Sequence, residues 1–272
     1  MRSDSMATNK FSSVAGKGLL GQRLQRLRES VGREWNTTPG WGLVVLAAPF
    51  LVALSSVAAA AAGKDAYKWF TQEDGFAESM QVLLYAAALV ISLLLTRRLW
   101  TSGERGLGGL YLLLSVGFFF LIGEEVNWGQ RIFGWVTPET WGDTNKQEET
   151  NLHNIYGVGD TFKWVQMLVG AYGAFLPLLV LRAKALARYR HKLAFLVPPL
   201  SLTHYFFFMF VWRAYRNLVP VPDRLYFVVS EYNEVIELIL ALGFLVFVIY
   251  QLRRIRLRQR AQAMDAEGIS AT

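Results

Sequence analysis

The sequence contains no cysteine and only three histidines. The absence of cysteine excludes disulfide bonds, thiolate metal sites and cysteine nucleophiles. No Walker-type phosphate loop, G-x-S-x-G nucleophile motif or H-E-x-x-H metal motif is present. Residues 16–21 match G-x-G-x-x-G, but no strand is expected before them, so we interpret the match as chance. What remains is an apolar chain: 53% of the 272 residues are hydrophobic.

Long apolar runs are the dominant feature. A helix needs about 20 residues to cross a hydrocarbon core, and isolated strands cannot satisfy their backbone in lipid. The pattern predicts an all-α, polytopic membrane protein with six transmembrane helices. We expect them at Trp41–Ala62, Phe76–Thr96, Leu107–Ile122, Thr161–Leu181, Leu193–Trp212 and Tyr226–Tyr250. Pro198-Pro199 is expected to break or kink the fifth.

The positive charges predict the orientation. With the N-terminus inside, 20 of the 28 Lys and Arg residues fall on the cytoplasmic side. This bias favours both termini in the cytoplasm. It also attributes the net charge of +7 to membrane sidedness, so no nucleic-acid partner is expected. The chain then divides into a cytoplasmic segment 1–40, a transmembrane domain 41–250 that includes an outer loop 124–160, and a basic cytoplasmic tail 251–272.

Two basic segments flank the spans. Residues 17–35 have leucines at helical spacing and arginines elsewhere on the surface, which predicts an amphipathic helix. Residues 251–260 continue the last span as a basic helix. Both are expected to contact anionic lipids of the inner leaflet.

Acidic side chains lie inside the last span. Glu231, Glu234 and Glu237 fall on one helical face. Counting inward, Glu234 and His204 both lie about 12 Å deep. An ionised carboxylate at membrane depth costs about 2.5–3.5 kcal/mol even on insertion scales. These groups must therefore be neutral, paired, ion-bound or placed in a water-filled cavity.

The polar residues predict a cavity that opens outward. It would be ringed by spans two, three, five and six, and the loop 136–160 would cover it with His153 pointing down. Its candidate catalytic residues are Glu124, Glu125, Arg131, His153 and Glu234. A divalent metal could be held by His153, His204, Glu231, Glu234 and Glu237. Further polar lining is expected from Glu78, Gln81, Gln130, Asn151, Asn154 and Asn233.

The segment after the third span carries the densest chemistry. If the helix continues through Trp135, then Glu124, Trp128, Arg131 and Trp135 share one face, and Glu124 could pair with Arg131. The tryptophans here and in neighbouring segments fit an aromatic belt at the outer interface.

Three functions are compatible with these residues. In the first, the protein is an enzyme that hydrolyses or transfers a group on a lipid or lipid-linked substrate, with a metal activating water or with His153 or a glutamate as general base. In the second, the carboxylates bind protons or cations during transport. In the third, the cluster is structural: Arg131, Lys163, Arg213 and Arg216 neutralise it, and the outer loop docks a partner.

The motif E-E-x-x-W-G-Q-R-I-F-G at 124–134, followed by T-P-E at 137–139 and E-T-N-L-H-N at 149–154, resembles a family of bacterial integral membrane proteins without an established activity. The similarity is dense over about thirty residues and extends to the multi-span architecture. It implies a location in the bacterial inner membrane. It implies no catalytic roles, so the three functions stay open.

Overall fold

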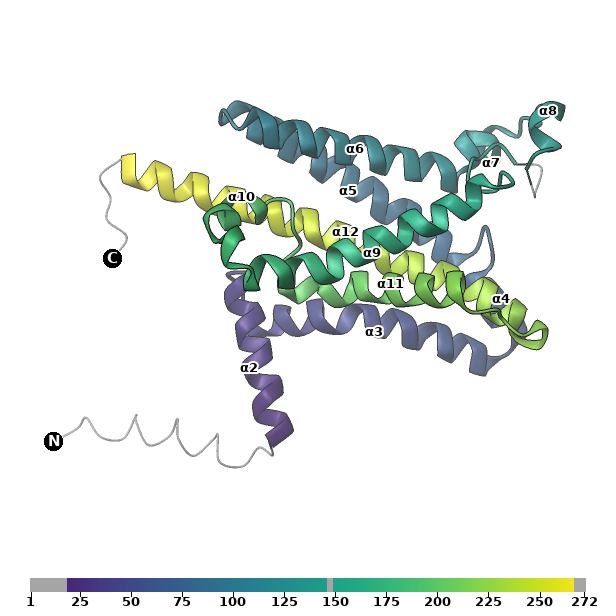
Figure 1. Cartoon of the computed structure of the whole chain (residues 1–272), viewed down its shortest axis with the longest axis horizontal. Coiled ribbons are helices and arrows are strands. Elements are labelled where there is room, and N and C mark those ends of the chain that lie inside the picture. Colours follow the sequence, from purple (N-terminus) through teal and green to yellow (C-terminus); the bar gives the residue numbers. More distant parts are fainter. Residues whose placement is uncertain (1–18, 146–148, 267–272) are drawn as a thin grey trace. The chain divides into compact units, whose positions relative to one another are not determined.

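The computed structural model describes residues 19–145 and 149–266. The chain divides into two compact units, Met1–Ala48 and Pro49–Thr272. Throughout the described residues the secondary structure is helical, without a strand, and one isolated bridge joins Asn145 to Ile155 (Figure 1). The all-α prediction is therefore confirmed for this part of the chain.

The first unit contains α2 (Leu19–Glu34) and the start of α3 (Pro39–Ala62). Helix α2 confirms the helix predicted over 17–35, although the first two of those residues lie outside the described part. A Cβ at Gly42 would lie 2.8 Å from the carbonyl oxygen of Arg28, so glycine allows this close approach. On α2, Leu24 and Leu27 are exposed, and the contact predicted between this helix and anionic lipids stays a prediction.

The second unit contains the remainder of α3 and all later elements. In chain order these are α4 (Lys64–Thr71), α5 (Phe76–Thr101), α6 (Arg105–Glu125), η1 (Asn127–Gly129), α7 (Gln130–Phe133), α8 (Glu139–Gly142), α9 (Val158–Arg182), η2 (Lys184–Tyr189), α10 (Arg190–Leu193), η3 (Leu200–Leu202), α11 (Thr203–Leu218) and α12 (Asp223–Ala266).

Within the described residues, five helical segments are long and apolar enough to cross a membrane. They are Pro39–Ala62, Lys64–Thr101, Arg105–Glu125, Val158–Arg182 and Asp223–Asp265. Each contains one of the predicted spans. This length and composition are those of a multi-pass membrane protein.

The predicted fifth span, Leu193–Trp212, does not form one helix. The chain is irregular around Pro198-Pro199 and resumes as η3 and then α11, which has 16 residues. Proline lacks an N–H and collides with the preceding turn, so a helix cannot run through this pair unbroken. At about 1.5 Å per residue, α11 is shorter than a bilayer core. It still returns the chain along the bundle between α9 and α12 (Figure 1).

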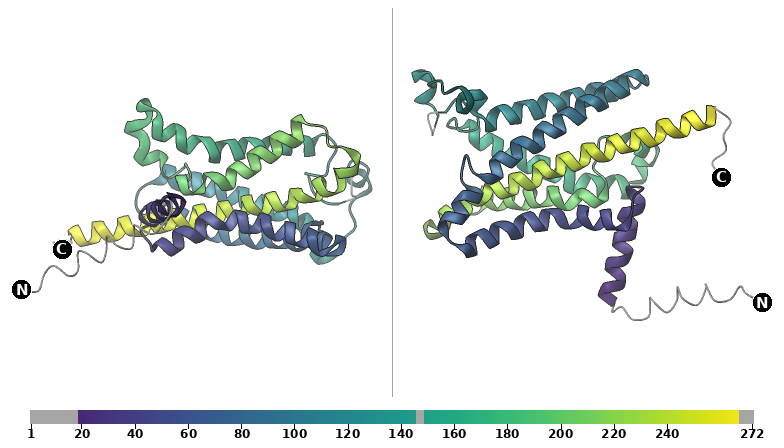
Figure 2. Two further views of the ribbon diagram at one scale, coloured as in Figure 1. Left: turned by 90° about the horizontal axis from the view of Figure 1, so that it is seen from below. Right: turned by 180° about the vertical axis from the view of Figure 1, so that it is seen from behind.

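Helices α5 and α12 form the centre of the second unit. Helix α5 packs against α6 and α12, and α11 packs against α9 and α12, as the two views of Figure 2 also show. Glu78, Gln81 and Tyr85, which are spaced along one side of α5, are buried, so these polar residues face other helices. Polar groups are thus placed inside the bundle rather than toward lipid.

Small residues allow α9 and α11 to approach closely. A Cβ at Gly170 would lie 2.5 Å from the backbone nitrogen of Phe210, and one at Gly173 would lie 2.1 Å from the ring of Phe206. Ala174, one turn further along α9 from Gly170, is also buried, so the two residues form a small-xxx-small pair.

We predict that Gly170→Ala lowers the free energy of unfolding by about 1–3 kcal/mol, because the new methyl group meets backbone atoms that cannot move aside. Gly117→Ala on α6 is the control, since its Cβ would meet no atom within 4 Å. Alanine favours a helix by about 0.5–1 kcal/mol over glycine, so the control should be neutral or stabilising. Denaturant unfolding in detergent micelles measures both. Equal effects would contradict the close approach.

A carboxylate-rich cavity under a polar cap

A cavity of about 270 Å³ lies between the helices of the second unit and residues 137–145 and 149–157, which we call the cap. Helices α6, α9, α11 and α12, the start of α5 and the α4–α5 connection contribute to it. It is lined by Thr71, Glu73, Glu78, Leu121, Glu124, Glu125, His153, Asn154, Gly159, Phe162, Lys163, Gln166, Arg213, Arg216, Tyr226, Ser230, Glu231, Asn233, Glu234 and Glu237.

Carboxyl groups outnumber cationic side chains in this lining. Among the described residues, seven glutamates face three permanently cationic side chains, Lys163, Arg213 and Arg216. Two of these cations are engaged locally: Lys163 Nζ lies 2.7 Å from Asp160 Oδ1, and Arg213 Nη2 lies 2.7 Å from Glu237 Oε1. The cavity therefore favours protons, cations and hydrogen-bond donors over unaccompanied anions.

The cavity begins where α6 ends. Asn127, Trp128 and Gly129 have φ angles of 49°, 52° and 98°, which is the left-handed region. Such values are rare for a bulky side chain such as tryptophan. They end α6 at Glu125 and turn the Trp128 ring back over Gly123, where a Cβ would lie 2.9 Å from the ring.

The helix does not continue through Trp135, so the condition for one shared face of Glu124, Trp128, Arg131 and Trp135 is not met. The left-handed turn separates α6 from the short helix α7, and Trp135 stacks on Phe133 with ring centroids 5.5 Å apart. The side chain of Arg131 lies outside the described part, so its pairing with Glu124 stays a prediction. The expected proximity of Trp128 to Glu124 is present, but it arises from the turn rather than from helical spacing.

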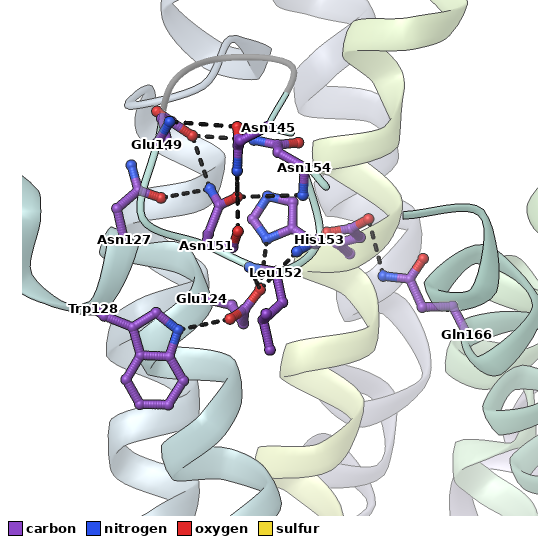
Figure 3. A network of polar contacts seen from close by, with 11 residues as sticks. Glu124, Asn127, Trp128, Asn145, Glu149, Asn151, Leu152, His153, Asn154 and Gln166 are labelled. Carbon is purple, nitrogen blue, oxygen red and sulfur yellow. Dashed lines mark hydrogen bonds and ion pairs between the residues drawn. The ribbon is translucent and has the colours of Figure 1, made fainter. Parts of the chain in front are cut away.

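Glu124 is the centre of the site. Its Oε1 accepts a hydrogen bond from Trp128 Nε1 at 2.7 Å. Its Oε2 accepts hydrogen bonds from the backbone nitrogens of Leu152 at 2.8 Å and His153 at 2.9 Å, and lies 3.2 Å from His153 Nδ1 (Figure 3). Glu124 is 3% exposed, so these bonds satisfy a carboxylate that water barely reaches. The end of a spanning helix thereby holds the cap in place.

His153 is about one-third exposed and forms part of the cavity wall. Burial disfavours its charged form, but the hydrogen bond to Glu124 and the negative charges of Glu237, Glu124 and Glu73 outweigh burial, and the pKa of His153 is raised above its ordinary value. The imidazole is thus held as a strengthened base beside an oriented carboxylate.

Amide side chains fix the cap above this pair. Asn151 is fully buried and donates from Nδ2 to Asn127 Oδ1 at 2.7 Å and to Glu149 Oε2 at 2.8 Å. Its Oδ1 accepts from Asn145 Nδ2 at 3.0 Å and from the backbone nitrogen of Asn154 at 3.2 Å (Figure 3). All four polar positions of this side chain are in use, so the cap has a defined conformation.

Deeper in the bundle, two glutamates of α12 have different partners. Glu234 Oε2 accepts from the neutral amide of Gln81 at 3.0 Å. Glu237 Oε1 accepts from Arg213 at 2.7 Å, Gln166 at 3.1 Å and Asn233. Glu237 is therefore charge-compensated, whereas the amide partner of Glu234 carries no charge.

Most of the predicted site residues meet at this cavity. The lining includes Glu78, Glu124, Glu125, His153, Asn154, Glu231, Asn233, Glu234 and Glu237. Three predicted lining residues stand behind it instead. Gln81 supports Glu234 from a fully buried position, while Asn151 and Gln130 belong to the hydrogen-bond network of the cap.

His204 does not join the cavity. It stacks on Phe50 with ring centroids 5.6 Å apart and contacts Tyr205. Arg213, nine residues further along α11, lines the cavity. Nine residues rotate a helix by about 900°, which places the two side chains on opposite faces and about 14 Å apart along the axis. The equal depth predicted for His204 and Glu234 is therefore wrong as well. Arg213 bonds to Glu237, and His204 lies about 14 Å further along α11, where its neighbour Tyr205 lies against Gly243.

The proposed metal set is not gathered around one point. Across residues 19–145 and 149–266, no group of three or more His, Asp or Glu side chains is placed to hold a metal ion. Carboxylates on one face of a single helix are spaced along the helix axis, whereas the ligands of a metal ion must point toward one position.

Sequence reasoning missed several contributors. Glu73, from the connection between α4 and α5, lines the cavity, as do Phe162 and Tyr226. Trp128 was assigned to an aromatic belt, yet its indole N–H binds Glu124. Asn145, Asn151 and Asn154 were the sequence signal that could have revealed the hydrogen-bond network of the cap, because buried amide side chains require partners.

Comparisons of this chain with protein-family models, curated proteins and solved structures gave no match. The resemblance to the bacterial membrane-protein family therefore stays a prediction.

We predict that Glu124→Gln lowers the pKa of His153, because the amide keeps the size of the side chain but removes the charge that stabilises the imidazolium. Nuclear magnetic resonance of isotope-labelled histidine measures this shift, with His191 and His204 as internal controls that should not move. A raised folded-state pKa means that the pair stabilises the fold fully below about pH 6.5 and that this stabilisation disappears as the pH rises through the folded pKa. An unchanged His153 pKa would contradict the pairing.

Proposed function

We propose that this membrane protein catalyses hydrolysis or group transfer on a lipid or lipid-linked substrate, with His153 as the general base and Glu124 as the residue that orients it. The observation that carries the proposal is the contact of 3.2 Å between His153 Nδ1 and Glu124 Oε2 in the wall of a cavity. A histidine held on one ring nitrogen by a buried carboxylate is an arrangement that supports acid–base catalysis.

The geometry supports specific roles for the two residues. Because Nδ1 of His153 is engaged by Glu124, Nε2 is the nitrogen left for a substrate hydroxyl or a water molecule. In the proposed step, Nε2 takes the proton of this hydroxyl or water while its oxygen attacks the substrate. The same proton then passes to the leaving group, which restores the neutral imidazole. Glu124 keeps its orientation because three further donors bind its two oxygens.

The acidic lining supports a selection among substrates. Seven glutamates around the cavity disfavour the approach of an unaccompanied phosphate group. They favour substrates whose reacting end is neutral or cationic and rich in hydrogen-bond donors. The described residues do not converge on a metal, so no step is assigned to one.

A second function, proton- or cation-coupled transport, is favoured by Glu234. This glutamate lies on α12 inside the bundle and is bonded to the neutral Gln81, not to a cation. A carboxyl group in an apolar bundle with a neutral partner can take up and release a proton. The ion pair between Arg213 and Glu237 and the hydrogen bonds that Glu124 accepts favour the structural alternative for these two carboxylates.

The location of the protein is also part of the proposal. The charge bias of the sequence supports both termini in the cytoplasm and the cap on the outer side. The resemblance to bacterial proteins supports the inner membrane. Residues 17–35 and 251–260 would then contact anionic lipids of the inner leaflet.

We predict that His153→Gln lowers catalytic turnover by about 10²–10⁴-fold, which is the usual contribution of a general base. The assay follows product formation by mass spectrometry in proteoliposomes made from total bacterial polar lipids. His204→Gln is the matched control, because this histidine lies on the opposite face of α11 from the cavity. If both variants lose turnover equally, or only in proportion to their abundance, the role of His153 is structural.

We predict for the transport alternative that Glu234→Gln abolishes cation uptake driven by a pH gradient, because an amide cannot release a proton. Flux into proteoliposomes loaded with a pH-sensitive dye measures this. Glu149→Gln in the cap is the control, since Glu149 bonds to Asn151 and Asn154 and is not part of the cavity lining. Uptake that is unaffected by Glu234→Gln, or absent in the wild type, would contradict coupling at this residue.

A further inference from the structure

The end of α7 and the loop that joins it to the cap, residues 132–136, expose an unusual amount of apolar surface. Val136 is 89% exposed, Phe133 73% and Ile132 68%. Trp135 is also exposed and stacks on Phe133, and Gly134 with φ 68° makes the turn that brings the two rings together. Contiguous large apolar side chains at a loop tip mark an interaction surface, because leaving them in water is unfavourable.

The base of this loop is polar and closed. Gln130, which precedes it, donates from Nε2 to the hydroxyl of Thr137, which follows it, at 3.0 Å. The Oε1 of Gln130 accepts the backbone N–H of Thr150 at 2.7 Å, and the hydroxyls of Thr137 and Thr150 lie 3.1 Å apart. Residues 132–136 therefore form a compact tip whose root is bonded directly to the cap.

The exposed surface is continuous with an exposed apolar side of α6. Leu113, Val116 and Phe119 are spaced three residues apart on that helix and are exposed. The ring of Phe119 meets the ring of Trp128, itself partly exposed, with centroids 6.2 Å apart. Trp128 lies two residues before α7, and in Figure 1 α7 lies beside the end of α6. The apolar surface thus runs along the span and on into the loop.

We propose that residues 132–136 insert into the lipid leaflet at the cap end of the bundle and thereby hold the cap over the cavity. The partner is the bilayer itself, because the loop extends a surface that already faces lipid and because exposed aromatic rings prefer the membrane interface. The backbone N–H of Thr150, which donates to Gln130, and the hydroxyl contact between Thr150 and Thr137 transmit this anchoring to Asn151–His153. The proposal is independent of the chemistry proposed for the cavity.

The absence of cysteine from the chain makes a direct test possible. A nitroxide spin label is attached to Val136→Cys in liposomes, and its collision rates with oxygen and with a water-soluble nickel complex are compared by electron paramagnetic resonance. Leu113→Cys on the exposed side of α6 is the lipid control, and Asp143→Cys on the exposed side of the cap is the aqueous control. Because Val136 is almost fully exposed, its replacement should not disturb the fold.

The expected result is that the label at 136 behaves as the label at 113 does, with oxygen collisions several-fold more frequent than nickel collisions. A label at 136 that the nickel complex reaches as easily as at 143 would overturn the proposal, because the loop would then lie in water. A label that neither reagent reaches would overturn it as well, because the loop would then be covered by protein, such as a second copy of this chain.

The anchoring of the cap by residues 132–136 is tested by a second measurement, the mobility of a spin label at position 143. Phe133→Ser removes apolar surface from the tip without touching the polar base of the loop, and it should increase the mobility of a label at 143. Trp100→Ser, which changes an exposed aromatic residue at the far end of α5, is the matched control and should leave that mobility unchanged. Equal mobility in wild type and Phe133→Ser would overturn the anchoring of the cap.

Discussion

The structure depends on one buried carboxylate at the end of a spanning helix. Glu124 accepts hydrogen bonds from Trp128 and from the backbone of Leu152 and His153, which are 28 and 29 residues away in the chain. A backbone N–H buried without a partner is costly, so the cap is held where the carboxylate can satisfy two of them. The helix can present this carboxylate because the left-handed turn at 127–129 ends α6 immediately after it.

The positions of the remaining carboxylates also follow from the cost of burying a polar group without a partner. A charged group cannot face lipid at modest cost, so each glutamate of α12 faces inward, toward an amide, an arginine or the cavity. Gln81 and Arg213 show the two available solutions, a neutral hydrogen bond for Glu234 and an ion pair for Glu237. A reaction in the cavity requires carboxyl groups that neither a hydrogen bond nor an ion pair fully compensates. His153 lies in the wall of the same cavity as these carboxylates. Histidine is the side chain whose ordinary pKa lies nearest to neutral pH, so it can both accept and release a proton there.

Local rules predicted the elements well and their ends poorly. Hydropathy located the long helices because burial in lipid requires nothing more than apolar length. The spacing of Glu231, Glu234 and Glu237 placed them on one face because helix rotation is fixed by covalent geometry. Periodicity could not reveal that Trp128 adopts a left-handed conformation, since this depends on the contact with Glu124. Nor could it exclude His204, whose face on α11 depends on where that helix begins after Pro198-Pro199.

The sequence by itself determined a helical membrane protein with carboxylates inside the bundle and a polar segment at one end. These properties depend on composition and on spacing within single helices. Only the tertiary structure decided that Glu124 pairs with His153 and that Gln81, Asn151 and Gln130 support the cavity from behind. It also decided that the exposed apolar residues 132–136 follow the left-handed turn at 127–129 and are joined at their base to Thr150. These contacts join residues far apart in the chain. The burial that stabilises them cannot be deduced from the pattern of residues within one segment.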